Sequence, residues 1–208
     1  GTVGLEILKK CVSRPLDAIF VCCGGGGLLA GVAAAVKRVR PTIKVIGVEA
    51  ADAAGMTESL RSGSIVTLPS AGLFADGAAV KTVGTETFRI CKKLVDEMIT
   101  VNNDEICSAI KLAYNDARVV LEPAGALGVA GLKKYVESNE ITGQTLVAIT
   151  SGANMDFDRL RFVSERADGS ERSLAVTVPE RPGAFRALYN LLWPRNVTEF
   201  SYRFESES

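Results

Sequence analysis

The stretch Ile19-Phe20-Val21-Cys22-Cys23-Gly24-Gly25-Gly26-Gly27-Leu28-Leu29-Ala30 places a short apolar run before four consecutive glycines and a run of small, helix-forming residues. Residues 19–22 are continuously apolar, as is typical of a strand buried on both faces. A helix is expected from Leu28 to about Arg38, because Pro41 cannot continue it. A strand, a glycine turn and a helix in this order indicate a β-α unit of a parallel sheet.

The same alternation continues on both sides of this stretch. Helices are predicted over 4–12, 56–61, 85–95, 103–114 and 122–135, strands over 44–49, 98–101 and 146–149, and an ordered loop over 68–81. In the fourth of these helices Asn103 is the expected cap, with an apolar face of Ile106, Ile110 and Tyr114. The sequence therefore predicts an α/β fold with a mainly parallel sheet, whose ligands gather at the carboxyl ends of strands. The loops after Cys22 and Thr150 lie at those ends.

The composition excludes several classes of function. Lys and Arg total 24, as do Asp and Glu, so charge gives no case for a nucleic-acid or anionic-membrane partner. No apolar run approaches the roughly 18–20 residues that span a bilayer. The chain has no histidine, which excludes Ser-His-Asp triads, Cys-His dyads and His-based metal sites. Five cysteines without metal-type spacing indicate reduced thiols in an intracellular protein.

The glycine run predicts a phosphate site. Its N–H groups join those of the first helical turn, and the helix dipole favours an anion there. A tight turn with positive φ is the alternative, but one glycine would suffice for it. Gly25-x-Gly27-x-x-Ala30 also matches a dinucleotide fingerprint, with Glu49 about 20 residues further on. An unbroken tetraglycine, and the lack of any acid or base for hydride transfer, count against a nicotinamide cofactor.

Residues 20–31 resemble the phosphate loop of the fold-type II pyridoxal-phosphate (PLP) enzymes, the tryptophan synthase β family. Within that family, several segments are similar to the threonine dehydratases: 72–81, 121–126, 151–155, 160–166 and 176–204. The resemblance covers essentially the whole chain in the right order. It implies a three-layer, parallel-sheet fold-type II PLP domain, of which residues 1–168 are the C-terminal portion. Residues 172–208 would then begin an α+β ACT-like regulatory domain.

The resemblance also assigns roles in binding the cofactor. Gly24, Gly25, Gly26, Gly27 and Leu28 would hold the phosphate of pyridoxal 5'-phosphate through backbone N–H groups, and Ser151 would hydrogen-bond the pyridine nitrogen. A hydroxyl, unlike a carboxylate, need not stabilise a protonated ring. From the sequence alone, Ser151 is equally well a helix N-cap after a strand.

Other candidate residues are weaker. Asp76-Gly77 is either a turn or a piece of backbone close to the cofactor. Lys81 is not expected to bind the cofactor covalently, because the family places its Schiff-base lysine well upstream. Glu122-Pro123 is most simply a helix start.

Neither a metal site nor a reactive thiol is expected. Glu49 and Asp52 occupy a region that binds a metal in the related serine racemases, but Asp52 does not match that pattern. Cys22 and Cys23 are expected to be buried and inert.

The activity that the resemblance implies is conversion of L-threonine, and also L-serine, by dehydration and deamination, which gives 2-oxobutanoate and ammonia from threonine. This is the first step of isoleucine biosynthesis, and isoleucine would inhibit it while valine opposes isoleucine. A homotetramer is expected, in the cytoplasm of a bacterium or in the mitochondrion or plastid of a eukaryote, with no nucleic-acid or membrane partner.

The chain is expected to be incomplete. Gly1-Thr2-Val3 resembles neither an initiator methionine nor a signal peptide. The family's catalytic lysine and its substrate loop are not in this sequence, so no catalytic residue is assigned and the chain alone is expected to be inactive. A related serine or threonine PLP lyase or racemase, and a non-catalytic truncated form, remain alternatives.

The C-terminal region changes character at residues 167–171, which are polar and turn-prone. A strand is predicted over 173–178, a helix over 184–193 after Pro182-Gly183, and a strand over 197–204. The match to an ACT-like module favours regulation over an ordinary βα turn.

Overall fold

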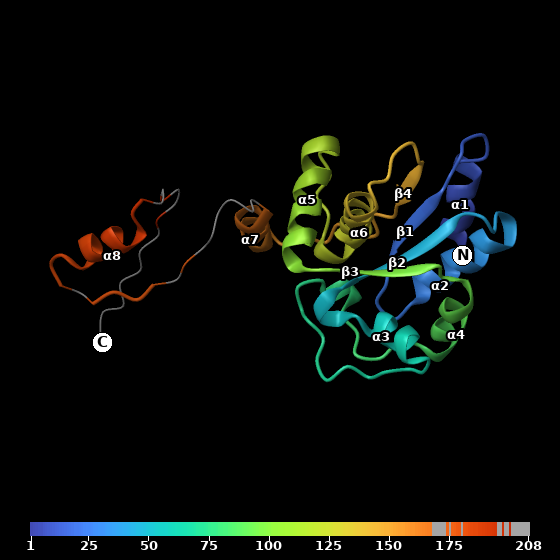
Figure 1. Ribbon diagram of the computed structural model, residues 1–208, viewed down its shortest axis with the longest axis horizontal. Helices are drawn as coiled ribbons and strands as arrows, with labels where there is room; N and C mark the ends of the chain where they lie inside the picture. The colour runs from blue at the N-terminus through green and yellow to red at the C-terminus, as the bar shows by residue number, and fades with distance from the viewer. Residues whose placement is uncertain (168–173, 175, 180, 195–196, 198–199, 201–208) are drawn as a thin grey trace. The chain divides into compact units, whose positions relative to one another are not determined.

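The computed structural model describes residues 1–167, 174, 176–179, 181–194, 197 and 200. The chain divides into two compact units, Gly1–Arg172 and Ser173–Ser208. In the first unit, the described residues form one sheet of parallel strands in the order β3-β2-β1-β4 (Figure 1). Its strands are β1 (Ala18–Cys22), β2 (Lys44–Ala50), β3 (Glu97–Val101) and β4 (Leu146–Ala148).

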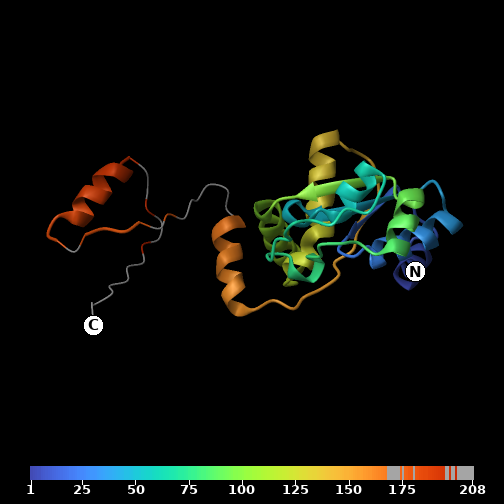
Figure 2. The same ribbon diagram turned by 90° about the horizontal axis from the view of Figure 1, so that it is seen from below.

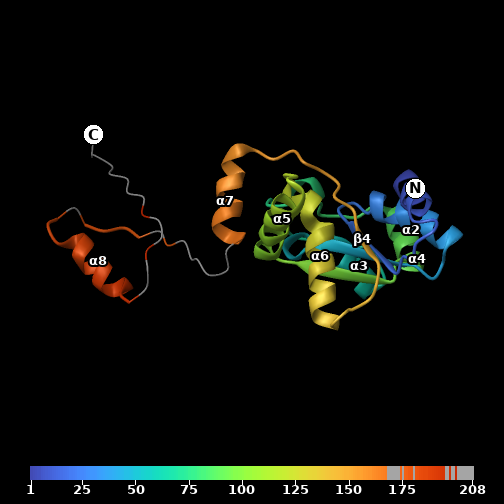
Figure 3. The same ribbon diagram turned by 90° about the horizontal axis from the view of Figure 1, so that it is seen from above.

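Helices cover both faces of this sheet, as Figure 1 shows and as the opposite views of Figures 2 and 3 confirm. One face carries α1 (Thr2–Lys10), α2 (Gly27–Val39), α3 (Gly55–Ser62) and α4 (Thr85–Leu94), and the other carries α5 (Asn103–Ala117), α6 (Pro123–Asn139) and α7 (Phe157–Ala167). Short 3-10 turns occur at Ala51–Ala53 (η1) and Asp76–Ala78 (η2). The predicted three-layer α/β fold with a parallel sheet is confirmed.

The apolar strands supply a core to each face, because successive side chains of a strand point to opposite sides. In β1, Ile19 and Val21 pack with α1–α4, whereas Phe20 packs with α5–α7, and all three side chains are fully buried. The runs are continuously hydrophobic because neither face is left to water. This explains why strand positions could be read from short apolar runs without alternation.

The start of α5 differs from the prediction by one residue. Asn102, not Asn103, is the cap: its side chain accepts a hydrogen bond from Glu105 N at 2.9 Å, and Glu105 Oε2 accepts one from Asn102 N at 2.6 Å. This reciprocal capping box satisfies two N–H groups of the first turn. Ile106 and Ile110 are buried as predicted, but Tyr114 is 49% exposed and lies against the guanidinium of Arg118.

Helix α7 is held to the rest of its unit by several contacts. Arg166 pairs with Asp104 at 2.7 Å, and Arg159 pairs with Asp76 at 3.2 Å. The ring of Phe162 lies 5.3 Å from that of Phe74, and Val163 is buried in the core beneath α5–α7. The last helix of the first unit therefore contacts both α5 and the segment that contains η2.

The second unit contains α8 (Ala184–Leu192), which follows Gly183 and confirms the predicted helix. Of the strand predicted over 173–178, Leu174 and residues 176–178 are described and are not in a strand, and positions 173 and 175 lie outside the described residues. Of the strand predicted over 197–204, Val197 and Phe200 are described and are not in a strand, and the remaining positions lie outside the described residues.

Candidate functional site

The tetraglycine loop joins the carboxyl end of β1 to the first turn of α2. The carbonyl oxygen of Gly25 accepts hydrogen bonds from Gly84 N at 3.2 Å and Thr87 Oγ1 at 2.6 Å. The carbonyl oxygen of Gly26 accepts one from Ala30 N at 2.9 Å. The carbonyls of the loop are thus held by the protein, which leaves its N–H groups available on the other side of the peptide planes.

Those N–H groups have no acceptor among the described residues. Within the part of the chain that the structure describes, the backbone amides of residues 24–29 donate no hydrogen bond. A Cβ atom built on Gly25 or Gly27 would meet nothing within 4 Å, and the first turn of α2 contains no acidic residue. Open space beside unpaired amides at the positive end of a helix suits an anion, and the phosphate of PLP meets these requirements.

Glycine is required at two positions of the loop. Gly26 has a φ of +89°, and a Cβ atom there would lie 2.6 Å from Met56 Cε. A Cβ atom on Gly24 would lie 2.9 Å from the carbonyl oxygen of Ala78, in η2. A turn that needs one left-handed glycine therefore explains Gly26 only. Gly24 is required for a different reason, because η2 packs directly against its backbone.

Ser151 lies on the exposed loop after β4, at the same edge of the sheet. Its Oγ is 3.2 Å from Sγ of Cys22, the last residue of β1. Strands β1 and β4 are parallel neighbours, so their carboxyl ends meet and bring Ser151 close to the glycine loop. The alternative role as a helix cap is wrong, because the next helix, α7, begins only at Phe157.

The two cysteines before the glycines differ from each other. Cys23 is buried, and burial together with the nearby Glu49 and Cys91 holds the pKa of its thiol well above its usual value. Cys22 is only partly buried and contacts Ser151, so the expectation that this residue is buried is wrong. Burial raises the pKa of Cys22, and the Glu122 carboxylate adds to that rise against the opposing hydrogen bond of Ser151.

Glu122 does more than begin a helix. It is the N-cap residue of α6, yet its side chain accepts no hydrogen bond from that helix; instead Oε2 accepts one from Asn154 N at 3.0 Å. Its own backbone N–H donates to the carbonyl of Gly152 at 3.2 Å. Glu122 therefore fixes the loop that carries Ser151. The sequence signals only the helix start, because Asn154 lies 32 residues away.

Asp76 belongs to a turn that is tied to α7. One carboxylate oxygen accepts from Gly77 N at 3.0 Å, and the other pairs with Arg159. Hydrogen bonding to Arg159 lowers the pKa of Asp76. The turn adjoins the glycine loop through the backbone of Ala78, whereas the Asp76 side chain is engaged with α7.

The burial and hydrogen bonds of Glu49 argue against a nicotinamide cofactor at this site. It is completely buried at the end of β2, where Oε1 accepts from Met56 N and Oε2 from Thr57 N, both at 2.8 Å. Thr57 Oγ1 donates to Oε2 as well, at 2.6 Å. Both oxygens are taken up by the start of α3, so neither is free for a ribose hydroxyl.

The remaining candidates differ from Glu49 in being exposed. The side chains of Lys81 and Asp52 are exposed. Among the described residues, no cluster of three or more Cys, Asp or Glu side chains could hold a metal ion. None of the described helices combines the length and apolarity needed to cross a membrane.

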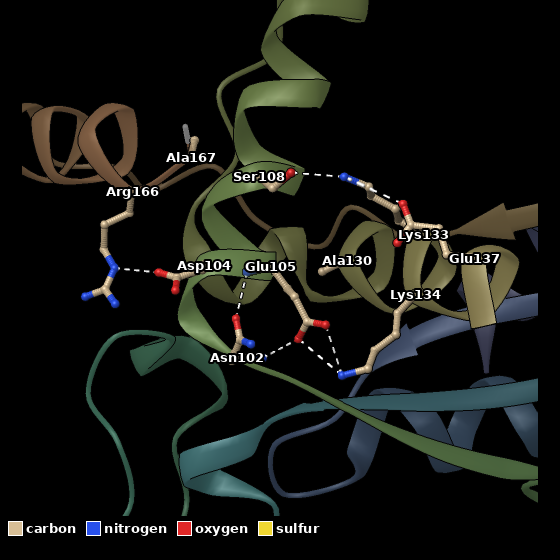
Figure 4. A pocket seen from close by; sticks show the side chains of 10 residues that line it. All are labelled: Asn102, Asp104, Glu105, Ser108, Ala130, Lys133, Lys134, Glu137, Arg166 and Ala167. Atoms are coloured by element: carbon tan, nitrogen blue, oxygen red, sulfur yellow. Dashed lines mark hydrogen bonds and ion pairs between the residues drawn. The ribbon is translucent and has the colours of Figure 1, made fainter. Parts of the chain in front are cut away.

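A hollow of about 260 Å³ lies between α5, α6 and α7 (Figure 4). Its charged side chains are largely paired with one another: Arg166 with Asp104, Lys134 with Glu105 and, at 3.9 Å, Lys133 with Glu137. No residue of the glycine loop lines it. The strand-end site described above, rather than this hollow, carries the unpaired donors.

Comparisons with known proteins agree with this geometry. Residues 1–152 match the family model described as pyridoxal-phosphate dependent enzyme, and residues 163–208 match the C-terminal regulatory domain of threonine dehydratase. The mitochondrial threonine dehydratase of Schizosaccharomyces pombe is 54% identical over all of this chain, and a biosynthetic L-threonine dehydratase of Burkholderia multivorans is 57% identical over 98% of it. The chain spans 35% and 40%, respectively, of the lengths of these relatives.

A solved structure shows the same likeness. The processed form of threonine deaminase isoform 2 from Solanum lycopersicum superposes with a TM-score of 0.78 at 46% identity. The match covers 80% of this chain and 48% of that one.

Proposed function

Because this chain belongs to the family of pyridoxal-phosphate-dependent enzymes, we propose that the protein containing it is a threonine dehydratase that converts L-threonine to 2-oxobutanoate and ammonia. The observation that carries the proposal is the set of unpaired amides at residues 24–29, beside open space and next to Ser151. L-Serine is a second substrate. The reaction is the first step of isoleucine biosynthesis.

In this proposal the chain supplies the cofactor-binding side of the site. The N–H groups of residues 24–28 bind the phosphate, and the dipole of α2 adds to the attraction. The Ser151 hydroxyl binds the ring nitrogen without placing a negative charge beside it, so it leaves the ring neutral. PLP itself, when bound, withdraws electrons from the α-carbon of an amino acid and labilises its α-proton and β-hydroxyl.

The covalent attachment of the cofactor tests the proposal. The full-length protein is loaded with PLP, reduced with borohydride and mapped by peptide mass spectrometry. We expect one modified lysine outside residues 1–208, together with 2-oxobutanoate production before reduction. A Ser151→Ala protein should carry the same modified lysine with lower turnover. Modification at Lys81, or no modified lysine, would contradict the proposed site.

We also propose that residues 172–208 belong to an ACT-like regulatory domain that responds to isoleucine, with valine opposing it. The match to the threonine dehydratase regulatory domain supports this. Full-length protein should lose turnover on addition of isoleucine and regain it with valine; a protein ended after Ala167 should not respond. A homotetramer is proposed as the assembly, measurable by light scattering.

The compartment follows the source organism in this proposal: cytoplasm in a bacterium, mitochondrion or plastid in a eukaryote. Similar relatives carry bacterial, mitochondrial and chloroplastic names. A racemase is disfavoured by the match to a regulatory domain of threonine dehydratase, and absence of D-serine after incubation with L-serine would exclude it.

A further inference from the structure

The contact between Cys22 and Ser151 joins two strand ends that are 129 residues apart in the chain. The Sγ–Oγ distance is 3.2 Å, short enough for a hydrogen bond that involves sulfur. Ser151 otherwise makes no hydrogen bond to the described residues, so the thiol is the group that orients its hydroxyl. The contact lies two residues before the first glycine of the phosphate loop.

We propose that Cys22 is a positioning residue whose thiol donates to Ser151 Oγ and so directs the Ser151 hydroxyl proton toward the ring nitrogen of PLP. This inference rests on the proposed function and deepens it. Cys22 itself touches neither substrate nor the reacting atoms; it acts through Ser151.

The direction of the hydrogen bond follows from what each group can donate. A hydroxyl has one proton and two lone pairs, whereas a thiol is a weak donor and a weak acceptor. A pyridine nitrogen is the stronger acceptor of the two candidates for the Ser151 proton, and the thiol proton then goes to a Ser151 lone pair. This requires the thiol to stay protonated, and burial together with the Glu122 carboxylate raises its pKa in that sense.

Two substitutions of Cys22 distinguish a role in positioning Ser151 from a role in packing. Cys22 is partly buried beside the core of the α5–α7 face, so an apolar side chain of similar size would pack there. Cys22→Val introduces a somewhat larger apolar side chain and removes the donor, while Cys22→Ser keeps a donor in a smaller side chain. A packing role predicts that Val is tolerated better than Ser. A positioning role predicts the reverse.

The experiment uses the full-length protein loaded with PLP, with variants Cys22→Val, Cys22→Ser, Ser151→Ala and the double variant Cys22→Val with Ser151→Ala. The readouts are the absorption band of the bound cofactor without substrate, and kcat and KM for L-threonine. We expect Cys22→Val to shift the band and to lower kcat about three- to tenfold with little change in KM, the scale of one lost hydrogen bond. Cys22→Ser should restore both.

The double variant is the decisive arm. If Cys22 acts through Ser151, Cys22→Val should change neither the band nor kcat in the Ser151→Ala background. Equal effects in both backgrounds, an unshifted band in Cys22→Val, or failure of Cys22→Ser to restore it would overturn the inference. Cys11→Val is the matched control, because Cys11 is, like Cys22, a partly buried free cysteine but lies at the end of α1 on the opposite face of the sheet, and it should match the parent protein in both readouts. A parent protein that binds no PLP would overturn the proposed function as well.

Discussion

Two helices begin at the carboxyl edge of the same sheet, and their N-termini are satisfied in opposite ways. At α3, the side chain of Glu49 reaches back from β2 and accepts from the amides of Met56 and Thr57. At α2, the amides of residues 24–29 find no acceptor among the described residues. The positive end of α3 is thus closed by a carboxyl group of the chain itself, whereas that of α2 is left open by the described residues. Glu49 lies at the spacing of the ribose-binding residue of a dinucleotide site, but its carboxyl group is used to cap α3. It is therefore not available to bind a nicotinamide cofactor.

Removing the carboxyl group that closes α3 should give the largest effect. Glu49→Ala leaves two amides and the Thr57 hydroxyl without their acceptor in a buried place, so we expect the free energy of unfolding to fall by about 2 to 4 kcal/mol. Urea denaturation of the full-length protein measures this. Glu58→Ala in the same helix is the control: its exposed pair with Arg61 should be worth less than about 1 kcal/mol. Equal losses in the two variants would show that Glu49 does not hold α3.

Giving α2 a carboxylate of its own should make it resemble α3. Gly25→Asp is sterically possible, since a Cβ atom there meets nothing within 4 Å, and it places a negative charge beside the open amides. We expect PLP to bind about 100-fold more weakly, because a carboxylate and a phosphate repel each other at this distance. Cofactor fluorescence titration measures the affinity. Gly25→Asn, of equal shape and no charge, should weaken binding much less; if the two bind PLP alike, the loop does not hold the phosphate.

The smallest expected effect is the pH dependence of stability that results from the titration of Glu49. Burial raises the pKa of Glu49 in the folded protein above its usual value, against the opposing hydrogen bonds from Thr57 and Met56. A raised pKa means that the folded state holds the proton to higher pH than the unfolded state does. The resulting stabilisation is complete below the unfolded pKa and is lost as the pH rises through the folded one.

The stability of the parent protein relative to Glu49→Gln should therefore decline as the pH is raised from about 4 toward neutrality. Urea midpoints of the two proteins across this range measure the difference. An advantage of the parent that grows with pH would mean that the three donors outweigh burial and that Glu49 is an anion in the folded state.

Much of this arrangement could be predicted from local sequence. Continuous apolar runs predicted the strands at 19–22 and 44–49, and breaks at proline and glycine predicted helix ends. The strand ends also predicted which loops would meet. The cap of α5 lies one residue before the predicted Asn103. The sequence does carry the signal that distinguishes the two asparagines, because Asn102 and not Asn103 is followed three residues later by a glutamate, Glu105.

The parts that could not be predicted depend on contacts between distant residues. The roles of Glu122, toward Asn154, and of Cys22, toward Ser151, arise because β1, β4 and α6 meet at one edge. Neither residue type signals such a contact by itself: a glutamate before proline is ordinary at a helix start, and a cysteine in an apolar run is ordinary core. The sequence likewise did not predict that Glu49 caps α3, because this contact forms only when the turn after β2 folds α3 back against the end of that strand.

Helix α7 determines where a chimaeric protein can be joined between the catalytic and the regulatory region. The match to the regulatory domain begins at residue 163, in the middle of Phe157–Ala167. Val163 is core of the first unit and Arg166 is paired with Asp104, so a chimaera joined at 163 would import two anchoring residues from the donor protein. A splice placed after Ala167 would keep the whole of α7 together with its own partners in the first unit.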